Sequence, residues 1–137
     1  MSRWLLLLGS NLPDDFHVRA ALDALAALGP CRTLGPIRRL PSSAGDGVWY
    51  HNVVATLEHP GGRALRDALR AIQVGLGRDD SVPGRVDIDI DLVARAGAGG
   101  AWIMDAHAAS KSEMHAGPVR RLFDDIGVVM RPPVEEA

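Results

Sequence analysis

The sequence predicts an α+β fold in which one antiparallel sheet carries helices on one face. Short apolar or alternating runs, typical of strands, are interleaved with two amphipathic helical repeats in the order β-α-β-β-α-β. The length of 137 residues suits a single domain, 1–137, and the 47% hydrophobic content is enough to fill a core. A run at 86–93 alternates apolar and acidic side chains, which indicates a strand with one buried and one polar face.

The first half of the chain is expected to form a strand, a helix and two further strands. Residues 4–8 are a continuous apolar run, as in a buried strand, and the corner Gly9-Ser10-Asn11 ends it. Apolar residues then recur at helical spacing until Gly29-Pro30, and Asp14 or Asp15 supplies the N-cap. The remaining elements are a weakly patterned strand at 31–40, a loop at 41–47 and a long strand at 48–57.

The second half continues with a helix, the alternating strand and a weaker C-terminal region. A turn at 59–62 precedes an amphipathic helix at 65–76, which Gly77 ends. A polar loop at 78–84 leads into the alternating strand at 86–93. Beyond it we expect a flexible Gly- and Ala-rich connection at 94–101, a last helix at about 119–126 that Pro118 opens, and a disordered tail after about residue 131.

This order of elements favours a ferredoxin-like β-α-β-β-α-β sandwich with a C-terminal helix added. In that arrangement the first and third strands form the central pair, the fourth strand is an edge, and the helices cover one face. The apolar side of the alternating strand should then meet the helices, and its acidic side should face solvent or a ligand.

Composition and charge exclude several classes of function. A formal net charge of −2 argues against a surface for nucleic acid or membrane. Cys31 is the only cysteine, which rules out an internal disulfide and fits a reducing, cytoplasmic setting. The apolar run at 4–8 is too short to span a membrane and leads into no cleavage-type segment, so we expect no signal peptide. We therefore expect small-molecule partners and a monomer or homodimer.

The alternating run is the best candidate for chemistry. Asp87, Asp89 and Asp91 share one face of the expected strand, with neighbouring carboxylates roughly 6.5–7 Å apart. Carboxylates held that close repel unless a cation stands between them, and a hard divalent cation prefers oxygen ligands. The alternative is an edge strand whose charges discourage aggregation, although such edges more often carry lysine.

Three further motifs each admit a functional and an ordinary interpretation. Gly9-Ser10-Asn11 offers local hydrogen bonds, but it also suits a plain strand-to-helix turn. Tyr50 and Asn52 face the same side of a strand and could stack on and hydrogen-bond a flat heterocycle, or simply pack across the sheet. Arg78 and Arg85 suit a polyphosphate, because a guanidinium is bidentate and always charged, but surface arginines are usually solvated.

Four segments, in order, resemble the 6-hydroxymethyl-7,8-dihydropterin pyrophosphokinases. That family opens with L-G-S-N-L, carries an aromatic-x-Asn-x-Val strand, ends a helix with I-E-x-x-L-G-R and holds a D-(I/L)-D-(I/L) strand. The matching segments here are Leu8-Gly9-Ser10-Asn11-Leu12, Tyr50-His51-Asn52-Val53-Val54, Ala71-Ile72-Gln73 through Leu76-Gly77-Arg78, and Asp89-Ile90-Asp91-Leu92. The resemblance spans roughly residues 3–93 and is fainter beyond.

The resemblance implies transfer of pyrophosphate from ATP to the hydroxymethyl group of a reduced pterin, in folate biosynthesis, on a ferredoxin-like fold. It implies that Asp89 and Asp91 hold two Mg²⁺ ions that bridge the ATP phosphates. The substrate-binding residues implied by position are Tyr50, Asn52, Arg39 and Leu40. The implied ATP-binding residues are Gln73, Arg78, Arg85, His107 and His115, and the implied catalytic residues are Asp89, Asp91, Arg78 and Arg85.

The chain also departs from the pattern of that family. Gln73 replaces the Glu of the helix, and Arg39-Leu40-Pro41 lacks the Thr of a T-x-P segment. Residues 79–83 lack the usual arginines, and Arg85 stands one position away from the expected Arg, which points it to the other side of an ideal strand. Two alternatives therefore stay open: a non-catalytic paralogue that binds pterin or nucleotide, and an unrelated ferredoxin-like domain for metal binding or interaction.

Overall fold

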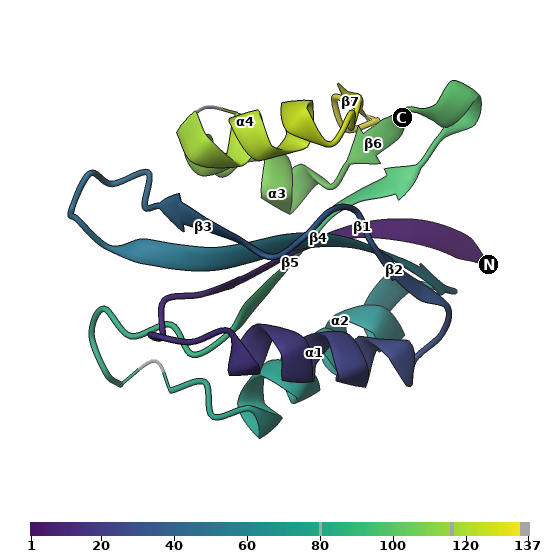
Figure 1. Ribbon diagram of the computed structural model, residues 1–137. Coiled ribbons are helices and arrows are strands. Elements are labelled where there is room, and N and C mark those ends of the chain that lie inside the picture. Colours follow the sequence, from purple (N-terminus) through teal and green to yellow (C-terminus); the bar gives the residue numbers. More distant parts are fainter. Residues whose placement is uncertain (80, 116, 135–137) are drawn as a thin grey trace.

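A computed structural model describes residues 1–79, 81–115 and 117–134 (Figure 1). Its strands and helices are β1 (Ser2–Ser10), α1 (Phe16–Ala26), β2 (Cys31–Thr33), β3 (Arg38–Pro41), β4 (Trp49–His59), α2 (Gly62–Gly75), β5 (Asp89–Ala96), η1 (Ala98–Gly100), β6 (Trp102–Met104), α3 (Ala106–Ala109), η2 (Ser112–Met114), α4 (Gly117–Asp125) and β7 (Met130–Arg131). Among the described residues, seven strands form one open sheet in the order β2-β4-β1-β5-β6-β7, with β3 also paired to β4. The pairs are antiparallel, apart from β6 and β7, which run parallel.

The sheet is the middle of three layers. α1 and α2 cover one face, while α3 and α4 lie over the other (Figure 1). A mixed α and β fold with one open, mostly antiparallel sheet is thus confirmed. The C-terminal helix exists as predicted, but it packs Leu122 and Phe123 on the face opposite α1 and α2, because that face carries a second apolar cluster that needs cover.

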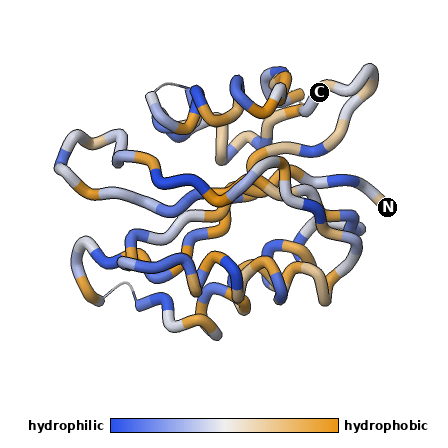
Figure 2. The backbone as a smooth tube through the Cα atoms, in the orientation of Figure 1, coloured by the Kyte–Doolittle hydropathy of each residue, from blue (hydrophilic) through white to orange (hydrophobic). Residues whose placement is uncertain are grey.

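β1 lies at the centre of the sheet because both of its faces are buried. Leu6 and Leu8 pack with α1 and α2, whereas Leu5 and Leu7 belong to the cluster beneath α4. None of the four is more than 5% exposed, which explains why this run is apolar throughout and does not alternate. Figure 2 shows the same pattern, with hydrophobic strand segments between the two helical layers.

The weak strand expected at 31–40 is two short strands, β2 and β3, which both pair with β4. They are separated at Gly35-Pro36. Gly35 has a φ of 91°, which suits glycine, and Pro36 has no N–H for a strand ladder. The break therefore has a cause in the sequence.

The expectation that the fourth strand is an edge was wrong for its second half. Residues 94–96 of β5 pair with β6. The Gly- and Ala-rich segment expected to be a flexible connection instead closes a tight turn, in which the Gly97 N–H donates to the Ala101 carbonyl at 2.8 Å. The turn folds Trp102 and Met104 back onto the sheet, where both are buried.

β5 begins at Asp89 and not at residue 86, and it contains a bulge. The predicted contact of its apolar side with α1 and α2 is confirmed for Ile88, Ile90 and Leu92. The register with β1 then shifts, and Val93 and Ala94 join the cluster on the opposite face. An extra residue in one strand produces such a change of face.

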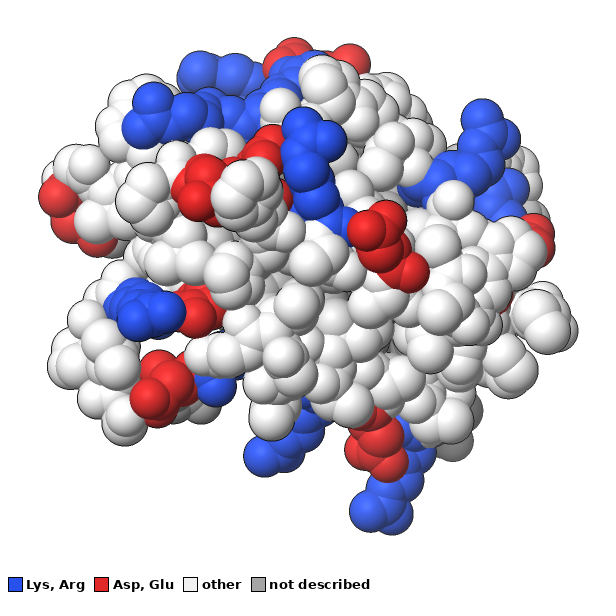
Figure 3. All heavy atoms as spheres, turned by 60° about the horizontal axis from the view of Figure 1, so that its bottom comes forward, with Lys and Arg blue, Asp and Glu red and all other residues white. Residues whose placement is uncertain are grey.

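Charges of both signs are interspersed on the face of the molecule seen in Figure 3. Within the described part of the chain, no helix combines the length and apolar character that a membrane span requires. Of the tail expected to be disordered, residues 135–137 lie outside the described residues, and β7 ends at Arg131.

Replacing Gly61 by Ala should destabilise the fold strongly. Gly61 has a φ of 84°, and an added Cβ would overlap the indole ring of Trp4, which is itself fixed by a 2.9 Å bond to the His59 carbonyl. The ψ of Gly61 is −150°, a combination that is almost confined to glycine. We expect Gly61→Ala to lower the free energy of unfolding by about 2–6 kcal/mol, the sum of about 1–3 kcal/mol of backbone strain and about 1–3 kcal/mol of overpacking. Urea denaturation measures the change.

Gly62→Ala is the matched control. Gly62 also has a positive φ, 64°, but a Cβ there meets open space. Only the strain of about 1–2 kcal/mol should remain. Equal losses in the two variants would contradict the assigned packing of Trp4.

Candidate functional site

Asp89 and Asp91 lie on the first half of β5, opposite Gly9 and Leu7 of β1. Their side chains share the sheet face that carries α3 and α4, as two-residue alternation requires. Asp89 is 37% exposed and Asp91 16%. The pair stands where two cavities meet, one of about 220 Å³ and one of about 530 Å³, and both cavities are lined by Asp89, Asp91 and Arg78.

The smaller cavity, called here the acceptor cavity, brings together most of the residues expected to bind substrate. Tyr50, Asn52 and Leu40 line it, together with the two carboxylates. The C-terminal segment forms its opposite wall with Met114, Pro118 and Val119. Arg39 is not among its lining residues, because neighbouring positions on β3 face opposite sides, and its guanidinium lies 5.4 Å from the centre of the Trp49 ring.

Gly9 gives Asn52 its place in this cavity. The Asn52 amide is buried and donates to the Leu8 carbonyl at 3.1 Å. A Cβ at residue 9 would come within 2.8 Å of that amide nitrogen. The ring of Tyr50 lies beside the same backbone, and burial raises the pKa of its phenol, with Asp46 adding to the rise. The phenol therefore remains a hydrogen-bond donor at neutral pH.

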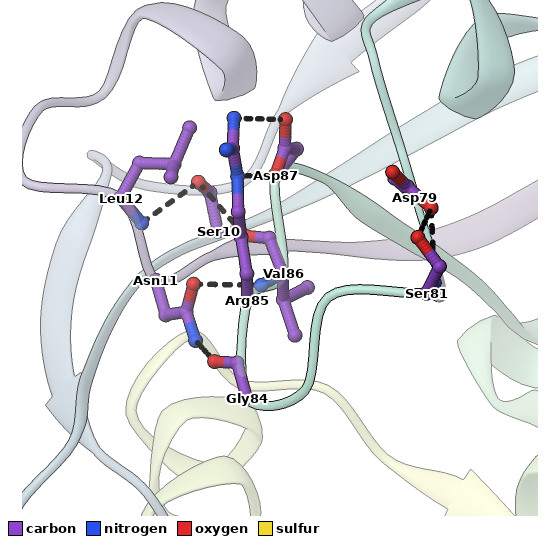
Figure 4. A network of polar contacts seen from close by, with 9 residues as sticks. All are labelled: Ser10, Asn11, Leu12, Asp79, Ser81, Gly84, Arg85, Val86 and Asp87. Carbon is purple, nitrogen blue, oxygen red and sulfur yellow. Dashed lines mark hydrogen bonds and ion pairs between the residues drawn. The ribbon is translucent and has the colours of Figure 1, made fainter.

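The Ser10-Asn11 corner holds the segment that precedes the acidic strand (Figure 4). The Asn11 side chain accepts from the Val86 N–H at 2.8 Å and donates to the Gly84 carbonyl at 2.6 Å. The Asn11 N–H donates to the Val86 carbonyl at 3.0 Å, and Ser10 Oγ donates to the same oxygen at 3.4 Å. The corner is therefore more than a strand-to-helix turn, because it fixes where β5 begins.

Arg85 and Asp87 lie apart from the carboxylate pair. The Arg85 guanidinium binds Asp87 through two bonds of 2.6 and 3.0 Å, and Asp87 is buried beside Gly77 (Figure 4). This pairing raises the pKa of Arg85. Arg85 lines neither cavity, although the resemblance implied a phosphate role for it. The alternation that placed Asp87 with the other two carboxylates does not extend before Asp89, since the chain is not yet a strand there.

The larger cavity, called here the cationic cavity, lies between α2, β5 and the α3 region. Of the residues expected to bind ATP, it contains Gln73, Arg78 and His107. His115 is elsewhere, with Nε2 at 2.6 Å from the Ala109 carbonyl oxygen. The lining residues that the sequence reasoning missed are Arg66, Arg70, Asp105 and Lys111. One signal was available, because Arg66, Arg70 and Gln73 recur at helical spacing, beside the apolar face of α2.

Gln73 joins the end of α2 to the acidic strand. Its side-chain oxygen accepts from Arg78 Nη1 at 2.6 Å and from the Ile90 N–H at 3.1 Å. Arg78 Nη1 also lies 2.8 Å from Asp89 Oδ1. The family Glu at this position would offer the same acceptor, so the change to Gln73 keeps the geometry of the contact and removes one negative charge.

Asp91 is the most perturbed acid of the site. Burial, followed by the charge of Asp89, raises the pKa of Asp91 to about 6, against the opposing effect of Lys111. Lys111 Nζ lies 2.6 Å from Asp91 Oδ1. Although burial opposes it, the carboxylates of Asp91 and Asp89 raise the pKa of Lys111.

The donor set fits Mg²⁺ held jointly with phosphate and not a metal held by protein alone. Within the described ranges, no group of three or more His, Cys, Asp or Glu residues is placed to hold a metal ion. Mg²⁺, however, is commonly bound by one or two carboxylates, with waters and substrate phosphates completing the octahedron. Asp89 and Asp91 supply such a pair, beside a cavity lined by three arginines and Lys111, of which Arg66 lies 3.6 Å from a further lining acid, Asp105.

A scan against models of known protein families gives no match for this chain, and no curated protein matches it.

The stability of the metal-free protein should depend on pH through Asp91. Its pKa in the folded state, about 6, lies above the ordinary value of 3.8, so the folded state binds the extra proton between about pH 4 and 6. The free energy of unfolding should therefore fall as the pH rises through that window. Because Asp91→Asn cannot ionise, its stability relative to wild type should rise by on the order of 2 kcal/mol from pH 4 to pH 7.

Urea denaturation of both proteins in a chelating buffer measures this difference. Asp23→Asn, at an exposed position of α1, is the control and should show no such rise. A stability difference between Asp91→Asn and wild type that stays constant with pH would contradict the assignment.

Proposed function

We propose that this chain transfers pyrophosphate from Mg²⁺-bound ATP to the hydroxymethyl group of a reduced pterin, in folate biosynthesis, as a divergent 6-hydroxymethyl-7,8-dihydropterin pyrophosphokinase. The observation that carries the proposal is that Asp89, Asp91 and Arg78 line both cavities. A transferase with two substrates needs donor phosphate and acceptor hydroxyl side by side, with charge-stabilising groups between them. The sequence resemblance and the cavities point to the same two carboxylates.

The acceptor cavity suits a small flat heterocycle. Tyr50 offers a ring face, Asn52 an amide, and Leu40 and Met114 apolar cover. The carboxylates lie at one end of this cavity, where the hydroxymethyl group would meet the phosphate.

The cationic cavity suits the phosphates of ATP. Arg66, Arg70, Arg78 and Lys111 supply positive charge around it, which compensates for the arginines that residues 79–83 lack. Mg²⁺ on Asp89 and Asp91 would neutralise charge on the transferred group and align it. The acceptor oxygen attacks the β-phosphorus, the bond from that phosphorus to the α-bridging oxygen breaks, AMP leaves with the electron pair, and the hydroxyl proton passes to solvent.

The strand order supports a ferredoxin-like domain. β2, β4, β1 and β5 lie side by side, and α1 and α2, which follow β1 and β4 in the chain, cover one face. This is the connectivity of two β-α-β units in one antiparallel sheet. β6, α3, α4 and β7 would then be additions that close the other face.

A catalytically impaired paralogue that binds pterin or nucleotide, with a regulatory or scaffold role, is the second candidate. One observation favours it: Arg85 is bound to Asp87 and away from both cavities, so a cation implied by the resemblance is not at the phosphates. Such a protein would bind the ligands without turnover.

Release of AMP from ATP, measured with 6-hydroxymethyl-7,8-dihydropterin and Mg²⁺, tests the proposal. Asp89→Ala and Asp91→Ala should each lower kcat/KM by more than about 100-fold, beyond the loss typical of residues outside the metal shell. Asp23→Ala, on the exposed side of α1, should keep wild-type activity. Ligand binding without release of AMP would favour the paralogue. If the protein neither bound the ligands nor released AMP, both candidates would be excluded.

Tyr50→Leu should weaken binding of the pterin and leave binding of ATP unchanged, because Tyr50 lines the acceptor cavity and does not line the cationic cavity. Loss of stacking, about 1–3 kcal/mol per ring, predicts a 5- to 150-fold rise in Kd measured by calorimetry. Tyr50→Phe should keep most of the affinity. Trp49→Leu removes an aromatic ring half-exposed beside Arg39 and serves as control. A larger effect at Trp49 than at Tyr50 would contradict the assigned face.

A further inference from the structure

Lys111 is the only lysine among the 15 Lys and Arg residues of the chain. It lies between α3 and η2 and lines the cationic cavity. Its ammonium group is 2.6 Å from Asp91 Oδ1, and its side chain is 28% exposed. A strongly hydrated ammonium is therefore drawn out of bulk solvent and onto a carboxylate of the candidate metal pair.

Each carboxylate of the pair already has a cation from the chain. Arg78 holds Asp89 at 2.8 Å, as Lys111 holds Asp91. A divalent cation cannot bind Asp91 Oδ1 while the ammonium group occupies it, because like charges repel strongly at such a distance. Metal binding through this oxygen therefore requires Lys111 to leave, and the displaced ammonium group then needs a new anion.

The two chain cations differ in their freedom to move. Arg78 is also bonded to Gln73, which is itself tied to the Ile90 N–H, so its guanidinium is braced by the fold. Lys111 carries a compact charge on a flexible stem of four carbons. Lys111 lines the same cavity as Arg66 and Arg70. An anion bound in that cavity would therefore lie within the space that the Lys111 side chain faces.

We propose that Lys111 is a positioning residue that exchanges its bond to Asp91 for a bond to a polyphosphate oxygen when a divalent cation binds the carboxylate pair. Cation and polyphosphate then bind jointly, and each binds poorly alone. The inference rests on the proposed function for its ligand class, a metal-bound polyphosphate, but it requires neither a pterin nor turnover.

Calorimetry with Mn²⁺, inorganic tripolyphosphate and their preformed complex tests the exchange. The complex should bind wild type at least about fivefold more tightly than either component, the lower end of ordinary coupling between sites. Lys111→Met should bind Mn²⁺ alone more tightly, by about fivefold, and the complex more weakly, so that the coupling is lost. A residue that merely supported the fold would shift both constants in the same direction.

Arg63→Met is the control, because it removes one positive charge from α2 at a side chain that is 93% exposed and lines neither cavity. It should reproduce both wild-type constants. Unchanged constants in Lys111→Met would overturn the proposal.

The unique lysine allows a second measurement on the unaltered protein. Protein labelled with ¹³Cε-lysine gives one lysine signal, which should shift when Mg²⁺ and tripolyphosphate are added together and shift little with either alone. A signal that stays in place at saturation with the complex would overturn the exchange even if Lys111→Met failed to fold. Coupled binding without AMP release would count against the pterin reaction alone, and AMP release without coupling would count against Lys111 alone.

Discussion

The antiparallel pairing of β1 with β5 determines the direction in which the two carboxylates of the candidate site point. The register sets Asp89 opposite Gly9 and Asp91 opposite Leu7, so both carboxylates leave the sheet on the side away from α1 and α2. The Asn11 side chain fixes this register, because it bonds to backbone groups of residues 84 and 86 just before the strand begins. A slip of one residue would bury the acids under the helices and expose Ile90.

That placement concentrates negative charge where burial makes it costly. Asp91 is mostly buried beside a second carboxylate, and both effects raise its pKa because they make the ionised form less favourable. Arg78 and Lys111 offset this cost in the isolated protein. A site of this kind favours any added group that brings more positive charge to the pair.

Much of the layout was predictable from local pattern. The continuous apolar run of β1 is typical of a buried strand, and the alternation at β5 has the two-residue period of a half-buried strand. Asp89, Asp91, Tyr50 and Asn52 do line one cavity. Apart from α4, the C-terminal third was not predictable, since its short elements owe their form to packing on a face already built by Leu5, Leu7 and Val54. Arg66, Arg70 and Lys111 were missed for a related reason: their meaning depends on which cavity the tertiary structure turns them toward. Arg85 was assigned to the phosphates from its position in the sequence, but in the structure it is bound to Asp87, two residues away.

The bulge at Val93 divides β5 into two half-strands with separate tasks. The first half presents the acids, and the second, residues 94–96, carries β6 and the layer beyond it. The extra residue already separates the side-chain alternation of the two halves. Substitutions in the second half can therefore change how β6 and the following layer pack without turning Asp89 and Asp91 to the other face of the sheet. The wall of the acceptor cavity can thus change its shape in evolution while Asp89 and Asp91 keep their orientation.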